Sequence, residues 1–330
     1  MNLKEEILKL KEKLDVTIVA HFYQRDEVFE LADITGDSLE LAKKAMQAKS
    51  KYILFCGVGF MGESVKVLSP NKRVLMPKVA CCAMARMIDV GYFDENLTIL
   101  NKAGIKNEDI LPITYINSSA AVKAAVGEMG GMVCTSSNAY KIIEKGLKSG
   151  KKIFFVPDRC LGQNFAKSLN LTSAIVGDGT DLNKADIICY NGFCSVHQLF
   201  TTEDIEFYRE KYPDILIAVH PECDPAICDM ADFVGSTSQL IKFIKELPVD
   251  QKVAVGTEYN MVNRLREKNT YILSSTKPEC PTMNETTLED VYNTLKQIES
   301  GQEEVWENEI IVEPNTVKWA KVALERMLEV

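Results

Sequence analysis

The sequence predicts an α/β protein built from three similar αβα sandwich domains with small parallel sheets. Short apolar segments typical of strands alternate with segments typical of helices along the 330 residues, and this alternation indicates parallel sheets covered by helices. Each third of the chain repeats the same plan of strand, polar loop and helix. Ligands of such sheets bind beyond the carboxyl ends of the strands. We therefore expect a pseudo-threefold arrangement around a central active site.

The first third begins with a charged helix at 4–13, whose apolar residues recur with helical spacing. Strands are expected at 16–20, 51–56 and 73–76. Helices are expected at 39–48, after the glycine-containing segment 57–64, and after the segment 77–85. The first domain is assigned to residues 1–102.

The remaining two thirds repeat this plan, with a second domain at 103–185 and a third at 186–330 that includes the C-terminal helices. Strands are expected at 110–116, 132–134, 152–156, 186–190, 215–219, 232–234, 252–255 and 271–273. Helices are expected at 120–126, 139–147, 164–169, 203–211, 239–246, 260–268, 288–300 and 316–328.

Composition narrows the class of protein. The 38 basic and 47 acidic side chains give a net charge of −9, which argues against non-specific nucleic-acid binding because that needs a basic face. The apolar runs are strand-sized, so no membrane span is expected. The N-terminus is a charged helix and not an export signal. Ten cysteines without such a signal indicate a reducing cytoplasm, where thiols serve structure, metal binding or catalysis.

The segment 191–200 is the strongest local indication of chemistry. It follows a predicted strand and carries Cys194 and His197, three residues apart on a glycine-containing turn. A thiolate and an imidazole can both bind metal, and histidine can also move protons near neutral pH. A half-buried cysteine beside a hydrogen-bonded histidine would explain this pair equally well. His21 and His220 are the only other histidines, and each also follows a predicted strand, which favours a functional reading.

Four hydroxyl side chains stand where predicted helices begin: Ser38, Ser136, Ser236 and Thr237. Helix capping alone would explain each of them. Several helix N-termini aimed at one cavity would also bind phosphate or carboxylate groups. Glu222 follows His220 in the sequence His-Pro-Glu and could act as a general base. Alternatively, its negative charge could serve only to stabilise the N-terminus of a helix. Tyr23 could pass a proton.

Seven of the ten cysteines fall into two groups. Cys56, Cys134 and Cys189 lie in apolar strands and are expected to be buried as small hydrophobic residues. Cys81, Cys82, Cys194 and Cys280 lie in loops, far apart in sequence and without the paired spacing of a zinc ribbon. Three thiolates from remote loops would suit an iron–sulfur cluster that leaves one iron open.

Many short motifs of this chain, spread over nearly its whole length, resemble those of the quinolinate synthase family of NAD biosynthesis. They are His21-Phe22-Tyr23-Gln24, Gly36-Asp37-Ser38-Leu39-Glu40-Leu41-Ala42, Cys82-Ala83-Met84-Ala85, Tyr115-Ile116-Asn117-Ser118, Thr135-Ser136-Ser137-Asn138, Cys194-Ser195-Val196-His197-Gln198, His220-Pro221-Glu222-Cys223, Ser236-Thr237 and Cys280-Pro281-Thr282-Met283. The resemblance implies three αβα domains around a pseudo-threefold axis. It also implies a transferase that condenses iminoaspartate with dihydroxyacetone phosphate to give quinolinate, phosphate and water.

The resemblance further implies a [4Fe–4S] cluster at the junction of the domains. Its ligands would be Cys82, Cys194 and Cys280, where Cys82 is chosen over the adjacent Cys81 because it directly precedes Ala-Met-Ala. The fourth iron would take substrate as a Lewis acid. An aspartate oxidase that supplies the imine is a candidate partner.

By the same resemblance, Tyr23 and Glu222 would form an acid/base pair with three histidines beside them, namely His21, His197 and His220. The carboxylates and the phosphate of the substrates would be held by residues of the same motifs, namely His21, Ser38, Tyr115, Asn117, Ser136, His220, Glu222, Ser236 and Thr237.

Two other functions compete with this one. A zinc-dependent hydrolase could use His197, His220 and Glu222, although the chain lacks a His-Glu-x-x-His helix. A non-enzymatic iron–sulfur redox sensor could respond to oxidation of Cys194 or Cys280. A brown, oxygen-labile protein would indicate a cluster, a colourless one would indicate zinc, and colour without turnover would indicate a sensor.

Overall fold

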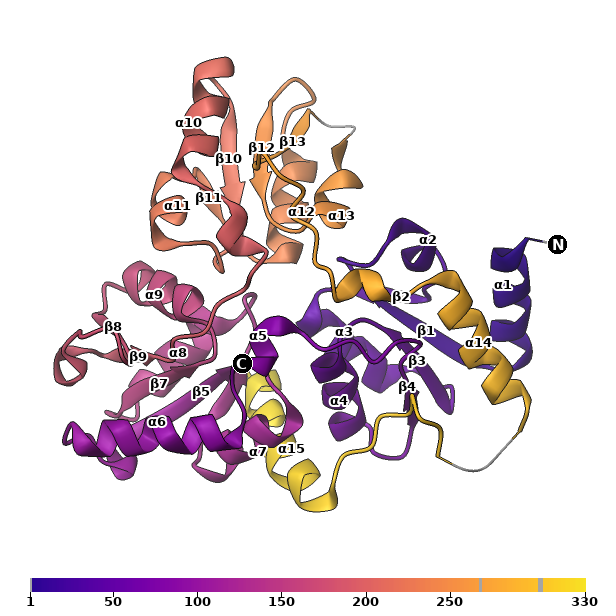
Figure 1. The fold of residues 1–330 in the computed structure, drawn as a ribbon, viewed down its shortest axis with the longest axis horizontal. Coiled ribbons are helices and arrows are strands. Elements are labelled where there is room, and N and C mark those ends of the chain that lie inside the picture. Colours follow the sequence, from indigo (N-terminus) through magenta and orange to yellow (C-terminus); the bar gives the residue numbers. More distant parts are fainter. Residues whose placement is uncertain (1, 267–268, 302–304) are drawn as a thin grey trace.

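Three parallel sheets form the framework of the protein, and Figure 1 shows them as three lobes around a common centre. The computed structural model describes residues 2–266, 269–301 and 305–330. The first sheet has the order β2-β1-β3-β4 and contains β1 (Val16–His21), β2 (Ile34–Gly36), β3 (Tyr52–Cys56) and β4 (Arg73–Leu75). All of its strand pairs are parallel.

The other two sheets repeat this order. The second sheet is β6-β5-β7-β9-β8, with β5 (Ile110–Tyr115), β6 (Met132–Cys134), β7 (Lys152–Val156), β8 (Ser173–Ile175) and β9 (Ile187–Cys189). The third is β11-β10-β12-β13, with β10 (Leu216–Val219), β11 (Phe233–Val234), β12 (Val253–Gly256) and β13 (Thr270–Ile272). The predicted α/β class with three small parallel sheets is confirmed.

Because the order is shared, each strand of one sheet has counterparts in the other two. The corresponding sets are β1, β5 and β10; β2, β6 and β11; β3, β7 and β12; and β4, β9 and β13. The loops after corresponding strands therefore occupy corresponding places in the three lobes.

Helices connect the strands and cover the sheets. They are α1 (Leu3–Lys13), α2 (Asp26–Phe29), α3 (Ser38–Gln47), α4 (Gly59–Leu68), α5 (Ala83–Arg86), α6 (Val90–Lys102), α7 (Ala120–Glu128), α8 (Ala139–Leu147), α9 (Arg159–Ser168), α10 (Thr202–Lys211), α11 (Pro225–Met230), α12 (Thr237–Glu246), α13 (Tyr259–Asn263), α14 (Leu288–Glu299) and α15 (Pro314–Leu328). Among the described residues, no helix combines the length and the apolarity that crossing a bilayer requires.

The last two helices return to the first two lobes, as Figure 1 shows. Helix α14 packs beside α1, where Val291 and Leu295 share a core with Ile7. Helix α15 packs closely against α7, because Gly127 has no side chain and a Cβ there would lie 2.2 Å from the carbonyl oxygen of Trp319. The C-terminal segment thus ties the N-terminal and middle parts of the chain together.

Several short elements were not predicted. The edge strands β2 and β8 have three residues each, of which only one is buried, so they carry too little apolar pattern for the sequence to reveal. The short helices α2 and α11 were missed for the same reason. Helix α9 begins at Arg159, not at 164, because the Asp158 carboxylate accepts the N–H of Leu161 and caps the helix five residues earlier.

The helix predicted at 260–268 is shorter in the structure, where α13 ends at Asn263, and residues 267–268 lie outside the described residues. The domain boundaries at 102/103 and 185/186 stay predictions. By sheet membership, β9 lies with the second sheet although its residues follow the second of these boundaries.

Candidate active site

A cavity of about 70 Å³ lies where loops from all three sheets meet. Thirteen of the residues that the sequence singled out line it: His21, Tyr23, Ser38, Cys82, Tyr115, Asn117, Ser136, Cys194, His197, His220, Glu222, Thr237 and Cys280. Ser236 is not among the lining residues, because its hydroxyl is turned to the helix N-terminus and to Ser137. The shared strand order explains the convergence, because equivalent loops of three sheets face one centre.

The loops after β1 and β10 place a histidine in the same way. The Nδ1 atom of His21 accepts the backbone N–H of Tyr23 at 3.1 Å, and Nδ1 of His220 accepts the N–H of Glu222 at 3.3 Å. Burial lowers the pKa of His21 to about 4 and that of His220 to about 3. Both rings are therefore neutral near pH 7, with the proton on Nε2.

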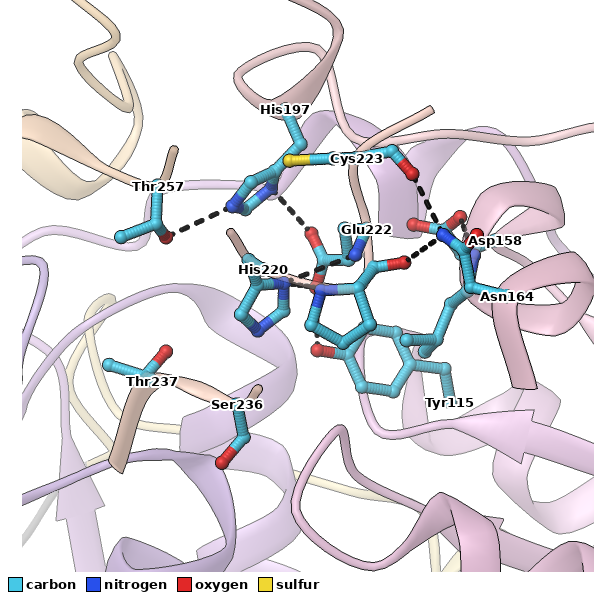
Figure 2. Close-up of polar contacts among 12 residues, drawn as sticks. Tyr115, Asp158, Asn164, His197, His220, Glu222, Cys223, Ser236, Thr237 and Thr257 are labelled. Carbon is cyan, nitrogen blue, oxygen red and sulfur yellow. Dashed lines mark hydrogen bonds and ion pairs between the residues drawn. The ribbon is translucent and has the colours of Figure 1, made fainter. Parts of the chain in front are cut away.

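A continuous chain of polar contacts runs along one wall of the cavity. The Tyr23 hydroxyl lies 3.0 Å from Thr257 Oγ1, which lies 3.1 Å from His197 Nε2. On its other side, His197 Nδ1 lies 2.9 Å from Glu222 Oε2, and Glu222 Oε1 accepts the Tyr115 hydroxyl at 2.6 Å. Figure 2 shows His197 between Thr257 and Glu222. The chain joins side chains from all three sheets.

The charges in this chain follow from burial and from neighbouring groups. Burial alone would raise the pKa of Glu222, but the adjacent His197 and His220 and the hydrogen bond from Tyr115 lower it to about 2. Burial and the Glu222 charge raise the pKa of Tyr23 and of Tyr115. Near neutral pH, the wall therefore presents one carboxylate between two neutral phenols.

The loops after β2, β6 and β11 meet at a second place beside the cavity. Asp37 Oδ2 accepts the hydroxyl of Ser137 at 2.8 Å and that of Ser238 at 2.8 Å, so one carboxylate links the three sheets. Its other oxygen caps α3 through the N–H groups of Leu39 and Glu40.

The expectation that all four hydroxyl residues cap helices was wrong for three of them. Asp37 caps α3, so Ser38 is the first helical residue, and α8 begins after Asn138, so Ser136 stands outside the helix. Ser236 caps α12 and Thr237 is its first residue. Because Ser38, Ser136 and Thr237 are not caps, their side chains line the cavity instead.

The loops after β4, β9 and β13 each contribute one cysteine to the cavity, namely Cys82, Cys194 and Cys280. A backbone N–H group favours the thiolate form of each cysteine, that of Ala85 for Cys82, of His197 for Cys194 and of Met283 for Cys280. Burial raises the pKa of all three thiols, that of Cys82 to about 12. Cys81 is exposed and does not line the cavity.

This donor set fits an iron–sulfur cluster. Three soft sulfur ligands reach one cavity from three loops, and N–H groups directed at cluster thiolates are among the features that tune such centres. Among the described residues, one other group could hold a metal ion: the ligand atoms of Cys194, His197 and Glu222 lie within 4.8 Å of one another.

The sequence reasoning missed three residues of this site: Asp37, Thr257 and Thr282. Thr257 follows β12 and bonds to both Tyr23 and His197, while Thr282 Oγ1 lies 3.5 Å from the sulfur of Cys280. The position of Thr257 beyond a strand was a usable signal. The side-chain partners of Asp37 and Thr257 in other lobes, by contrast, are 60 or more residues away in sequence, so no local pattern reveals them.

Comparisons with known proteins agree with this site. A family model described as quinolinate synthetase A protein matches residues 5–329. A quinolinate synthase of Helicobacter pylori is 55% identical over 334 residues, covering 99% of this chain and 98% of that protein. Quinolinate synthases of Acidobacterium capsulatum and Streptomyces coelicolor are each 39% identical, covering 100% and 96% of this chain and 93% and 86% of their own lengths.

Proposed function

The chain belongs to the quinolinate synthase family, and from this membership we propose that it condenses iminoaspartate with dihydroxyacetone phosphate to give quinolinate, phosphate and water. The observation that carries the proposal is the cavity itself. It brings three thiols, a carboxylate, two phenols and three histidines together from three sheets.

Cys82, Cys194 and Cys280 are the residues that would hold a [4Fe–4S] cluster, with no protein ligand for its fourth iron. Such a cluster supplies a Lewis-acidic iron that polarises an oxygen or nitrogen of the substrate. Their placement in one cavity, with N–H groups on each sulfur, supports this assignment.

Both proposed substrates are anions, yet among the residues that the structure describes no lysine or arginine lines the cavity. We assign their phosphate and carboxylate groups to neutral donors. The hydroxyls of Ser38, Ser136 and Thr237 line the cavity, and two of these residues are the first residues of the helices α3 and α12, whose N-termini favour anions. Asn117 adds a side-chain amide whose NH₂ group could donate to such an anion, while its buried Oδ1, which has no partner among the described residues, could only accept a hydrogen bond.

The proton transfers are assigned to Tyr23 and Glu222. Condensation, elimination of phosphate and loss of water each move protons, and Glu222 is a carboxylate that can accept them. A proton can pass between Tyr23 Oη and His197 Nε2 by one exchange at Thr257 Oγ1. Glu222 would stabilise the imidazolium that forms on His197, as the carboxylate of a hydrolase triad does.

The burial of these groups favours the same chemistry. His197, His220, Glu222 and Thr257 are all less than 5% exposed, so the reacting centre is largely dry. Such a site favours dehydration steps, because bulk water is excluded from the reacting groups and interactions between charges and dipoles are stronger there.

Anaerobic purification followed by iron and sulfide analysis, a visible spectrum and an activity assay tests the proposal. We expect about four irons and four sulfides per chain and a broad absorption that bleaches in air. Formation of quinolinate from the two substrates would then support the reaction. Stoichiometric zinc without iron after anaerobic reconstitution would contradict the cluster and the proposed role of the three cysteines.

A zinc-dependent hydrolase remains the second candidate, because Cys194, His197 and Glu222 could hold a single divalent ion. The metal analysis separates the two functions. We also propose an aspartate oxidase as the source of the imine and a reducing cytoplasm as the location, which the ten free cysteines support.

A further inference from the structure

The turn that carries Tyr23 in the first lobe is held by the helix α13 of the third lobe. Tyr23 follows β1 of the first sheet, but three consecutive backbone carbonyls of its turn accept side chains from α13 and the residue that ends it. Arg264 bonds to the carbonyls of Phe22 and Gln24, the latter at 2.9 Å. Asn260 bonds to the carbonyl of Tyr23 at 3.0 Å.

The two donors form a matched pair. Asn260 and Arg264 are four residues apart, so they project from the same face of the helix. Figure 1 shows α13 on the side of its lobe that faces α2. Arg264 also pairs with Asp26 at 2.7 Å and lies over the ring of Phe29, 4.2 Å from its centroid. Four groups thus fix the guanidinium group of Arg264: two carbonyls of the turn that carries Tyr23 and two side chains of α2.

The contacts of the Tyr23 side chain point the same way. Its hydroxyl bonds to Thr237 and Thr257, both in the third lobe. Backbone and side chain of one residue of the first lobe are therefore both positioned by the third lobe. Any shift between these lobes would move Tyr23 Oη relative to Thr257 unless the turn moves with the third lobe.

We propose that Arg264, with Asn260, is a positioning residue for Tyr23: it fixes the turn at residues 22–24 to the third lobe and so holds Tyr23 Oη at Thr257. The inference rests on the role proposed for Tyr23. It adds residues that lie outside the cavity lining, so they act on the reaction through the position of the tyrosine and not by lining the site.

The variant Arg264→Met tests this, because it removes the fork while keeping much of the side chain. Arg264→Lys keeps the charge but can serve only part of the fork, and it provides a milder variant if Arg264→Met does not fold. Asn260→Ala is less suitable, because Asn260 Nδ2 also bonds to Asn284 in the loop that follows Cys280.

Arg209→Met is a matched control. Arg209 also belongs to the third lobe, bonds to a backbone carbonyl, that of Met230, at 2.7 Å, and lies 3.6 Å from the carboxylate of Asp232. It does not contact the turn that carries Tyr23. We expect this control to behave as the parent protein in every assay.

Three measurements on the anaerobically purified protein decide the outcome. For Arg264→Met we expect kcat to fall by about 10–100-fold with little change in KM, because a displaced proton donor slows chemistry more than binding. Iron and sulfide content should equal that of the parent. In protein labelled with 3-fluorotyrosine, the fluorine resonance of Tyr23, assigned by its loss in Tyr23→Phe, should shift or broaden.

The fluorine signal separates the inference from the proposed function. A displaced Tyr23 resonance with reduced kcat supports both. A displaced resonance with unchanged kcat supports the positioning by Arg264 and contradicts the role of Tyr23 in the reaction. An unmoved resonance in both Arg264→Met and Arg264→Lys overturns the inference, whatever the activity.

Discussion

Cys189 and Cys194 lie five residues apart on one segment, yet they have opposite surroundings. Cys189 ends β9 and is fully buried. Burial and neighbouring acidic groups raise the pKa of its thiol, and no hydrogen bond lowers it. Cys194 lies in the loop beyond, lines the cavity, and accepts the N–H of His197. The strand cysteine fills space, whereas the loop cysteine presents its sulfur to a site.

The same contrast holds in the other lobes. Cys56 and Cys134 are fully buried in β3 and β6, and burial alone raises the pKa of each thiol. Cys82 and Cys280 lie in loops, and both line the cavity. The comparison teaches that backbone position, and not residue type, separates a packing thiol from a candidate ligand, because the strand cysteines face the core and the loop cysteines face the cavity.

The largest effect should come from the loop member of the pair. We expect Cys194→Ala to lose the brown chromophore and all measurable quinolinate formation, because a ligand of the proposed cluster is gone. Cys189→Ala should keep both and lose only about 1 kcal/mol of stability through the small cavity it leaves. Iron and sulfide analysis with denaturant unfolding checks the pair. Equal iron content in the two variants would break the comparison.

Removing the carboxylate next to the loop cysteine should separate proton transfer from metal binding. For Glu222→Gln we expect full iron and sulfide content but a turnover rate lower by about 10²–10⁴-fold, the range for loss of a general acid or base. The amide keeps the size of the side chain and removes the charge. Steady-state kinetics on protein of known iron content measures this, and near-normal turnover would remove Glu222 from the acid/base role.

The reactivity of the thiols in iron-free protein offers a pH-dependent test. Burial raises the pKa of Cys82 to about 12, so its thiolate fraction and its alkylation rate should rise by about tenfold per pH unit from pH 8 to pH 10. Exposed Cys81 is the internal reference on the same peptide. Fragment masses after iodoacetamide treatment distinguish the two. A Cys82 rate that levels off below pH 9 would show that the loop, not burial, governs this thiol.

The smallest effect should come from the hydroxyl beside the third loop cysteine. Thr282 Oγ1 lies 3.5 Å from the sulfur of Cys280. Thr282→Val should keep the shape of the site and the iron content, but it should lower the reduction potential of the proposed cluster, because hydrogen bonds to the sulfurs favour the reduced state. Redox titration of the parent and the variant checks this. An unchanged potential would mean that the hydroxyl does not interact with the cluster sulfur.

Much of the fold was readable from the sequence because its strands are short, apolar and bounded by polar loops. Strands such as β6 and helices such as α8 have the predicted bounds. The family resemblance also came from the sequence alone, and the comparisons confirm it. What failed were the edge strands β2 and β8, with one buried residue each, and helix starts set by a single capping side chain, such as Asp158 for α9.

The sequence by itself determined the alternation of strands and helices, the residue types at the strand ends, and the split between strand and loop cysteines. These are local properties, set by apolar periodicity and by the need to cap free backbone groups. Only the tertiary structure decided that Thr257 joins Tyr23 to His197, that Asp37 links three loops, and that Arg264 holds the turn of Tyr23. Each of these contacts depends on how three separate sheets pack, and no stretch of sequence encodes it alone.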